Sequence, residues 1–283
     1  MLRYALFFAT NMAILVLATV VLSLFGVSPS RLPGLWILGA CVGFGGALIS
    51  LWSSKAIAKW SMGLEMIDPA APGSSDRAWL VQVVHRQAEQ AGIKAPEVAI
   101  WPSDDVNAFA TGPTRNSALV AVSTGLLANM RQDEVEAVLA HEVSHAANGD
   151  MVTMALLQGV LNTFVFVIAR VLADRLGGMY RLLAIIALEI GLGLLASTIA
   201  MWFSRRREFR ADAGAANLVG RHKMIAALRA LSRDRQPPQL PETLAAFGMR
   251  GDAHPTGWRK LFLSHPPLED RIAALELHSR TVS

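Results

Sequence analysis

Four long apolar runs, almost free of charged residues, dominate the hydrophobic pattern of the chain. The runs are Tyr4–Phe25, Leu32–Ser54, Met151–Ala169 and Leu182–Phe203, and only Glu189 interrupts the last of them. Each is close to the roughly 20 residues that an α-helix needs to cross the hydrocarbon core of a bilayer. The pattern therefore predicts two membrane helices within 1–54 and a membrane hairpin of two more helices within 151–203.

The first run has a second interpretation, a secretory signal peptide, because it follows the positively charged Arg3. However, its apolar part is about twice the usual length of roughly 7–15 residues, and no small-residue cleavage pattern ends it. A retained first membrane helix is therefore favoured.

Glu189 is unusual because placing an ionisable side chain within a membrane helix costs free energy. A functional role is therefore the first hypothesis for such a residue. Two structural explanations are favoured over a function. The carboxylate can pair with Gln158 or Asn162 of the preceding helix, or the hairpin can be kinked and fail to cross the membrane fully.

Two polar segments, 55–150 and 204–283, follow the two pairs of apolar runs. In the first, Asp76–Ala91 has the apolar spacing of a helix, whereas Glu97–Trp101 and Ala118–Val122 are short β-rich runs. We therefore expect a mainly α, α+β protein, with a four-helix membrane portion and a soluble domain that contains a small β-sheet.

The composition agrees with a membrane protein. The chain is 53% hydrophobic and only 17% charged, whereas soluble domains contain about 25% charged residues. Its one cysteine, Cys41, lies in the second apolar run, which excludes a disulfide framework and a thiolate metal site. No patch of basic and aromatic residues indicates nucleic acid, so the lipid bilayer is the expected partner.

The distribution of lysine and arginine predicts the orientation in the membrane. Arg3, Lys55, Lys59 and the run Arg205–Arg207 flank one side, while the two short connections between helices carry fewer unbalanced basic residues. Because positive charge collects on the cytoplasmic side, both termini and the polar segments should face the cytoplasm. Such basic clusters beside a membrane favour anionic lipid.

The sequence His-Glu-Val-Ser-His at 141–145 is the strongest candidate for chemistry. Residues four apart share one face of a helix, so the imidazoles of His141 and His145 can reach one metal ion. Glu142 lies close enough to take a proton from a water molecule, as in zinc peptidases. The alternative is a chance pair of surface histidines.

Flanking residues predict that this motif lies on a helix, which the metal interpretation requires. Asp133 and Glu134 fit the first turn, where carboxylates interact favourably with the helix dipole. Asn148-Gly149 is a typical helix end.

A catalytic zinc takes three protein ligands and keeps a fourth position open. If 151–203 forms an antiparallel hairpin, the residues after 203 return close to His145. Glu208 is the first carboxylate there, and Asp212, one turn later, can hold a histidine N–H. A helix beside the membrane with an acid pair among arginines explains the same spacing, so the residues alone leave the ligand open.

The string HEVSHAANGDM at 141–151, followed after the hairpin by SRRREFRADAGAANLVG at 204–220, resembles the HtpX family of bacterial membrane zinc proteases. These belong with the membrane gluzincins of the CaaX prenyl protease type. Asn107–Gly112, the run ALVAVSTGLL at 118–127 and the tail SHPPLEDRI at 264–272 match as well. The resemblance covers nearly the whole chain, with several independent motifs in order.

The resemblance implies that His141, His145 and Glu208 bind one zinc ion per subunit, that Glu142 is the general base, and that Asp212 contacts a ligand histidine. It also implies a zincin-like catalytic domain at the cytoplasmic side of the bacterial inner membrane. There the protein would degrade misfolded or damaged membrane proteins, with a role in the stress response.

His265, just before the predicted helix Leu268–His278, is our candidate for the group that stabilises the tetrahedral intermediate. A surface histidine at a helix start is the alternative. Family relatives also suggest an edge strand that pairs with the substrate backbone, formed by Asn107, Ala108, Phe109, Ala110 and Thr111. An ordinary strand that ends at Gly112-Pro113 remains open.

Two other functions are alternatives to the degradation of damaged membrane proteins. A dedicated processing peptidase like the prenyl-protein relatives would enclose a large chamber with more than four membrane helices. A metal-binding scaffold without activity would not need Glu142, because binding zinc does not require this residue. Both therefore fit the sequence less well than an endopeptidase.

Overall fold

The computed structural model describes residues 32–174, 176–233 and 266–277. They belong to two compact units. The first comprises residues up to 50 together with 155–200, and the second comprises 51–154 together with the residues from 201 onwards. The first predicted membrane helix, Tyr4–Phe25, lies outside the described residues.

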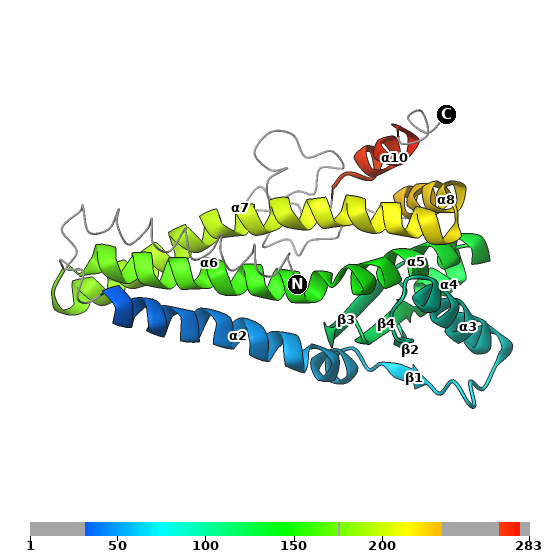
Figure 1. Ribbon diagram of the computed structural model, residues 1–283, viewed down its shortest axis with the longest axis horizontal. Coiled ribbons are helices and arrows are strands. Elements are labelled where there is room, and N and C mark those ends of the chain that lie inside the picture. Colours follow the sequence, from blue (N-terminus) through cyan, green and yellow to red (C-terminus); the bar gives the residue numbers. More distant parts are fainter. Residues whose placement is uncertain (1–31, 175, 234–265, 278–283) are drawn as a thin grey trace. The chain divides into compact units, whose positions relative to one another are not determined.

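Three helices among the described residues are long and apolar enough to cross a membrane (Figure 1). They are α2 (Leu32–Ser61), α6 (Asp150–Ala173) and α7 (Gly178–Val219). Their surfaces carry large exposed apolar side chains such as Ile49 and Ile190, which are 71% and 62% exposed. Such surfaces are rare on soluble proteins and suit contact with lipid.

The three helices match the second, third and fourth predicted runs, but α2 and α7 extend well beyond them. In α7 the helix continues for sixteen residues past Phe203, to Val219. The added segment contains no proline and is rich in arginine and alanine, which are strong helix formers. As a result, Glu208 and Asp212 lie on the same continuous helix as the fourth apolar run.

In the first unit, small residues allow α2 and α6 to approach closely. A Cβ atom added to Gly43 would lie 2.5 Å from Oγ1 of Thr163 and 2.7 Å from the carbonyl oxygen of Gly159. Nearby, the rings of Trp36 and Phe164 meet edge to face at 5.4 Å. Close backbone approach at small residues is typical of helix packing in membranes.

The expectation that Glu189 pairs with Gln158 or Asn162 is wrong. Gln158 donates to Asn162 within α6 at 2.7 Å, whereas Glu189 accepts a hydrogen bond from Arg170 of α6 at 2.6 Å. A guanidinium compensates the carboxylate charge better than a neutral amide does, which favours this pairing where water is scarce.

The second unit contains a four-stranded mixed sheet in the order β1-β2-β4-β3. Its strands are β1 (Glu65–Ile67), β2 (Glu97–Trp101), β3 (Ala108–Thr114) and β4 (Ser117–Ser123). Strands β2 and β4 are parallel, and the other neighbours are antiparallel. The small sheet and both predicted β-rich runs are therefore confirmed, with β3 at one edge of the described sheet.

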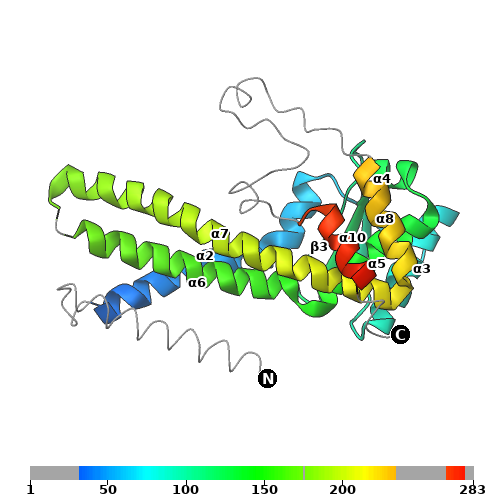
Figure 2. The same cartoon turned by 90° about the horizontal axis from the view of Figure 1, so that it is seen from above.

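Helices cover one face of this sheet and form the main core with it (Figure 2). The helices against the sheet are α3 (Ser75–Gln90), α4 (Thr124–Asn129) and α5 (Gln132–Asn148). Helix α8 (Arg221–Arg233) packs on α5, and α10 (Leu268–Leu277) packs on α8. Alternate strand residues such as Val120 and Val122 point into this core, while Leu119 and Ala121 point to a small cluster on the other face. The alternation follows from the two-residue period of a strand.

Glu136 fixes three of these helices to one another. Its carboxylate on α5 accepts hydrogen bonds from Arg86 of α3 and Lys223 of α8. In addition, the buried side chain of Gln87 donates to the backbone carbonyl of Glu136 at 2.9 Å. These contacts hold α5, the helix that carries the His-Glu-Val-Ser-His motif, between its neighbours.

Candidate metal centre

Helix α5 begins and ends where the sequence predicted. At its start the Glu134 carboxylate accepts a hydrogen bond from the backbone N–H of Arg131 at 2.9 Å. At its end Gly149 adopts a left-handed conformation with φ of 70°, which glycine tolerates without strain. The imidazoles of His141 and His145 consequently lie on one face, with ring centroids 4.6 Å apart.

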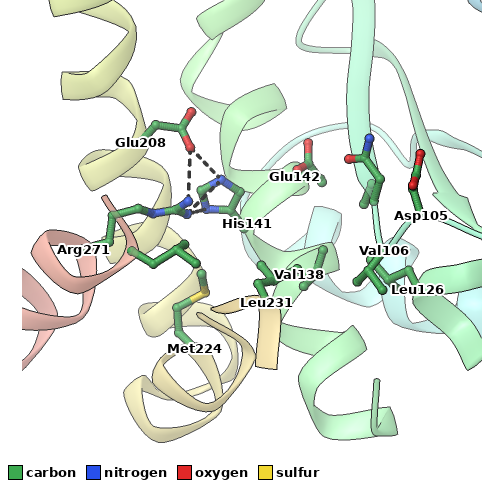
Figure 3. A pocket seen from close by; sticks show the side chains of 13 residues that line it. Asp105, Val106, Leu126, Val138, His141, Glu142, Glu208, Met224, Leu231 and Arg271 are labelled. Carbon is green, nitrogen blue, oxygen red and sulfur yellow. Dashed lines mark hydrogen bonds and ion pairs between the residues drawn. The ribbon is translucent and has the colours of Figure 1, made fainter. Parts of the chain in front are cut away.

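Glu208 of α7 completes a cluster with these two histidines. Nε2 of His141 lies 3.1 Å from Nε2 of His145 and 3.5 Å from Oε2 of Glu208. Nε2 of His145 lies 3.3 Å from Oε1 of Glu208. Ligand atoms around a tetrahedral metal with bonds of about 2.0–2.2 Å would be roughly 3.3–3.6 Å apart. The three side chains therefore fit around one metal ion, and Figure 3 shows His141 and Glu208 facing each other.

The other ring nitrogen of each histidine is held by a buried carboxylate. Nδ1 of His141 lies 2.9 Å from Oδ1 of Asp212, and Nδ1 of His145 lies 2.7 Å from Oδ2 of Asp150. This arrangement leaves both Nε2 atoms directed at Glu208, as metal-binding histidines require. Asp212 thus lies beside His141, the kind of contact that the sequence analysis expected for it, and its role stays a prediction. Asp150, which lies beside His145, was missed in the sequence.

Arg271 of α10 is a second residue that the sequence analysis missed. Its guanidinium donates to both carboxylate oxygens of Asp212, at 2.7 and 2.6 Å. Nη1 of Arg271 also lies 3.6 Å from Oε2 of Glu208. The side chain is buried, with 6% exposure for the residue, so that this cation compensates carboxylates inside the protein.

The neighbouring carboxylates make the two histidines more basic. Burial alone would lower the pKa of His145, but hydrogen bonds to Asp150 and Glu208 outweigh burial and raise this pKa to about 9. Burial would also lower the pKa of His141, but the hydrogen bonds with Asp212 and Glu208 outweigh burial and raise this pKa. The pKa of Asp212 is lowered because Arg271 and His141 outweigh the effect of its burial. The site therefore favours bound positive charge.

A close helix contact places Glu208 beside the histidines. A Cβ atom added to Gly214 of α7 would lie 2.6 Å from Oγ and 2.9 Å from Cβ of Ser144 on α5. No larger residue fits there unless the helices shift. Gly214 therefore permits the short distance between the two helices that carry the cluster.

A pocket of about 350 Å³ opens beside the cluster. Its wall includes Glu142, and Figure 3 shows this carboxylate between His141 and Asp105. Apolar side chains from five segments form much of the remaining wall, including Val106, Leu126, Val138, Met224, Leu231 and Leu268. The pocket can accept an apolar group next to the Glu142 carboxylate and the cluster of His141, His145 and Glu208.

The proposed substrate strand is only partly directed at this pocket. Asn107 and Ala108 line the pocket, and Ala108, Ala110 and Thr111 lie on the edge strand β3. The ring of Phe109, by contrast, packs against Trp101 at 5.2 Å on the opposite face of the sheet. Its side chain is therefore turned away, and a contact with substrate stays a prediction. His265 lies outside the described residues.

Comparisons with known proteins agree on the family. Residues 74–278 match peptidase family M48. Protease HtpX of Xanthomonas campestris pv. campestris (strain B100) is 54% identical over 290 residues, which cover 99% of this chain and 98% of the relative. Protease HtpX of Stenotrophomonas maltophilia (strain K279a) is also 54% identical, over 96% of this chain and 97% of the relative.

The solved structure of S. mikatae Ste24p has a similar fold, with a TM-score of 0.60 over 97% of this chain. The identity is 19%, and the chain spans 64% of the length of that protein, so this likeness concerns the fold alone. The family match and the full-length relatives go further, and a metallopeptidase family implies a metal for the cluster of His141, His145 and Glu208. The chain therefore belongs to peptidase family M48 and is a membrane metalloprotease.

Proposed function

We propose that the protein is a zinc-dependent endopeptidase in which His141, His145 and Glu208 hold one zinc ion per chain. The observation that carries this proposal is the set of distances between the three ligand atoms, 3.1–3.5 Å, which suits tetrahedral zinc. Two imidazoles and one carboxylate form the donor set of many catalytic zinc sites. Asp212 orients His141 through its Nδ1 atom.

Glu142 serves as the general base. It precedes His145 on α5 and lines the pocket beside His141, where a water molecule and a peptide bond would meet. A bound zinc ion supplies Lewis acidity, which makes a water molecule more acidic and polarises a carbonyl group. Glu142 takes the proton of the attacking water and delivers it to the leaving amine.

Two further roles complete the proposal. His265 supplies the hydrogen bond that stabilises the developing oxyanion, a role for which its place in the Ser-His-Pro-Pro sequence before α10 is the support. The segment 107–111 binds the substrate backbone, since β3 is an edge strand and Asn107 and Ala108 line the pocket. An extended peptide can add to such an edge through main-chain hydrogen bonds.

The substrates are misfolded or damaged membrane proteins, which the protease cleaves from the cytoplasmic side of the inner membrane. In this proposal 1–54 and 151–203 anchor the chain, while 55–150 and 204–283 together form the catalytic part. The basic residues beside the apolar runs, among them Lys55, Lys59 and Arg205–Arg207, support this orientation.

Metal removal tests the proposed function. We expect detergent-purified protein to cleave an unfolded membrane protein, to lose this activity in a chelator, and to recover it when stoichiometric zinc is returned. The measurements are zinc content by atomic spectroscopy and substrate cleavage by gel electrophoresis. Cleavage that persists at full rate in protein shown to be free of metal would exclude a metalloprotease mechanism at this site.

Cysteine labelling tests the proposed orientation. In a Cys41→Ser background, Asp174→Cys lies between α6 and α7, and His222→Cys lies in α8 after the hairpin. If the hairpin crosses the membrane and the catalytic part is cytoplasmic, an impermeant maleimide added to intact cells should label only position 174. Equal labelling of both positions from outside would show that the hairpin does not cross.

A further inference from the structure

We propose that Asp150, the first residue of α6, is a positioning residue that fixes the orientation of the His145 imidazole. The proposal rests on the zinc site proposed above. In this proposal Asp150 orients His145 in the same way as Asp212 orients His141. It also makes the first turn of an apolar helix part of the support of the metal centre.

The chain geometry directs Asp150 at His145. Helix α5 ends at Asn148, and the left-handed Gly149 turns the chain so that α6 begins directly at Asp150. The carboxylate thereby folds back over the last turn of α5, and its Oδ2 atom lies 2.7 Å from Nδ1 of His145. Only a residue that can adopt positive φ makes this reversal without strain, and Gly149 does so.

Three groups with positive or partial positive charge lie around the Asp150 carboxylate. The residue is 1% exposed, so an ionised carboxylate needs compensation at short range. Three sources provide it: the N-terminus of α6, His145 itself, and Arg210 of α7, whose Nη2 atom lies 3.9 Å from Oδ1. With this geometry the Asp150 carboxylate accepts a hydrogen bond from Nδ1–H of His145 and leaves Nε2 of that ring free to bind a metal ion.

Asp150 also connects the third ligand to the histidine helix. Arg207 and Arg210 lie on either side of Glu208 in the sequence, and both lie close to Asp150. Nη1 of Arg207 donates to the carbonyl oxygen of Asp150 at 3.5 Å. The arginine-rich run around Glu208 thus contacts the residue that orients His145, which ties α5, α6 and α7 together at the cluster.

Zinc affinity of position 150 variants tests the proposal independently of catalysis. We expect Asp150→Ala to weaken zinc binding by about 10–100-fold, the effect typical of lost carboxylate partners of metal-binding histidines. Asp150→Asn should recover a clear part of this loss because its amide oxygen still accepts the Nδ1–H hydrogen bond. The matched control is Asp133→Asn. The Asp133 carboxylate lies in the first turn of α5 and contacts Arg131 rather than a histidine, so this variant should bind zinc as the wild type does.

Competition with a chromophoric chelator measures the affinities, and cleavage is then assayed at saturating zinc. Here kcat should fall in the order wild type, Asp150→Asn, Asp150→Ala, with KM unchanged because the pocket wall is intact. Wild-type affinity in Asp150→Ala, or equal losses in the Asn and Ala variants, would overturn the proposal. If Asp150→Ala does not fold, wild-type zinc affinity in Asp150→Asn together with an unchanged kcat would also overturn it. Wild-type protein that binds zinc without cleaving would instead count against the proposed function.

Discussion

Replacing Glu142 with glutamine is expected to lower kcat for peptide hydrolysis by about 10²–10⁴-fold, the usual contribution of a general acid–base group. Zinc content should remain at one ion per chain. The physical reason is that glutamine keeps the size of the side chain but cannot take a proton from water. The cluster of His141, His145 and Glu208 does not include position 142, so the donor atoms for the metal are unchanged.

Steady-state cleavage of a fluorogenic peptide and zinc analysis of the same preparation measure both quantities. Glu89→Gln makes the same chemical change at an exposed position of α3 and should leave kcat unchanged. A Glu142→Gln or Glu142→Ala variant as active as the wild type would rule out the proposed base. Loss of zinc along with activity would instead mean that Glu142 supports the metal site itself.

The sequence was sufficient to predict the local parts of this site. The helix of the motif could be located because Asp133 and Glu134 mark its first turn and Asn148-Gly149 its end. The pair of histidines on one face then follows from helix geometry alone. The small sheet was likewise predictable, since its strands have short β-rich patterns bounded by turns.

Contacts between distant segments could not be derived in the same way. The guanidinium of Arg271 lies 3.4 Å from Nδ1 of His141 although 130 residues separate them, and no periodicity encodes such a distance. Asp150 is near in sequence, yet its contact with His145 depends on the left-handed turn at Gly149. Asp150 and Arg271 lie within the strings HEVSHAANGDM and SHPPLEDRI. The resemblance of these strings to the family motifs was therefore the signal that could have pointed to both residues.

The membrane helices illustrate a different limit. Hydropathy located three apolar runs that the structure confirms as helices, because a run of this length is a strong signal. It could not show that α7 continues through the arginines to Glu208 and Asp212, since charged residues end a hydropathy run but not a helix. The partner of Glu189 was missed because Arg170 follows the apolar run Met151–Ala169, whereas α6 continues to Ala173 and includes Arg170 in its last turn.

Replacing Glu208 with alanine is expected to abolish both zinc binding at stoichiometric zinc and cleavage. The loss of affinity should exceed the roughly 10–100-fold that removal of an outer carboxylate partner causes, because Glu208 supplies one of the three donor atoms. The substitution also removes a carboxylate from beside the buried Arg271, because Nη1 of Arg271 lies 3.6 Å from Oε2 of Glu208. Arg271 keeps Asp212 as a partner, but a buried cation with less compensation disfavours a second cation nearby, so that zinc binding should be weakened further.

The contrast with Glu142→Gln makes this result diagnostic, since one carboxylate should control cleavage alone and the other both cleavage and metal binding. Glu208→Asp keeps a donor oxygen on a shorter side chain and should retain weakened zinc binding, which separates ligation from the general effect of losing charge. Glu276→Ala, on the exposed face of α10, removes a carboxylate paired with Arg229 and should change neither property. Full zinc occupancy in Glu208→Ala would mean that the third donor comes from elsewhere, because two histidines alone do not hold a catalytic zinc ion tightly.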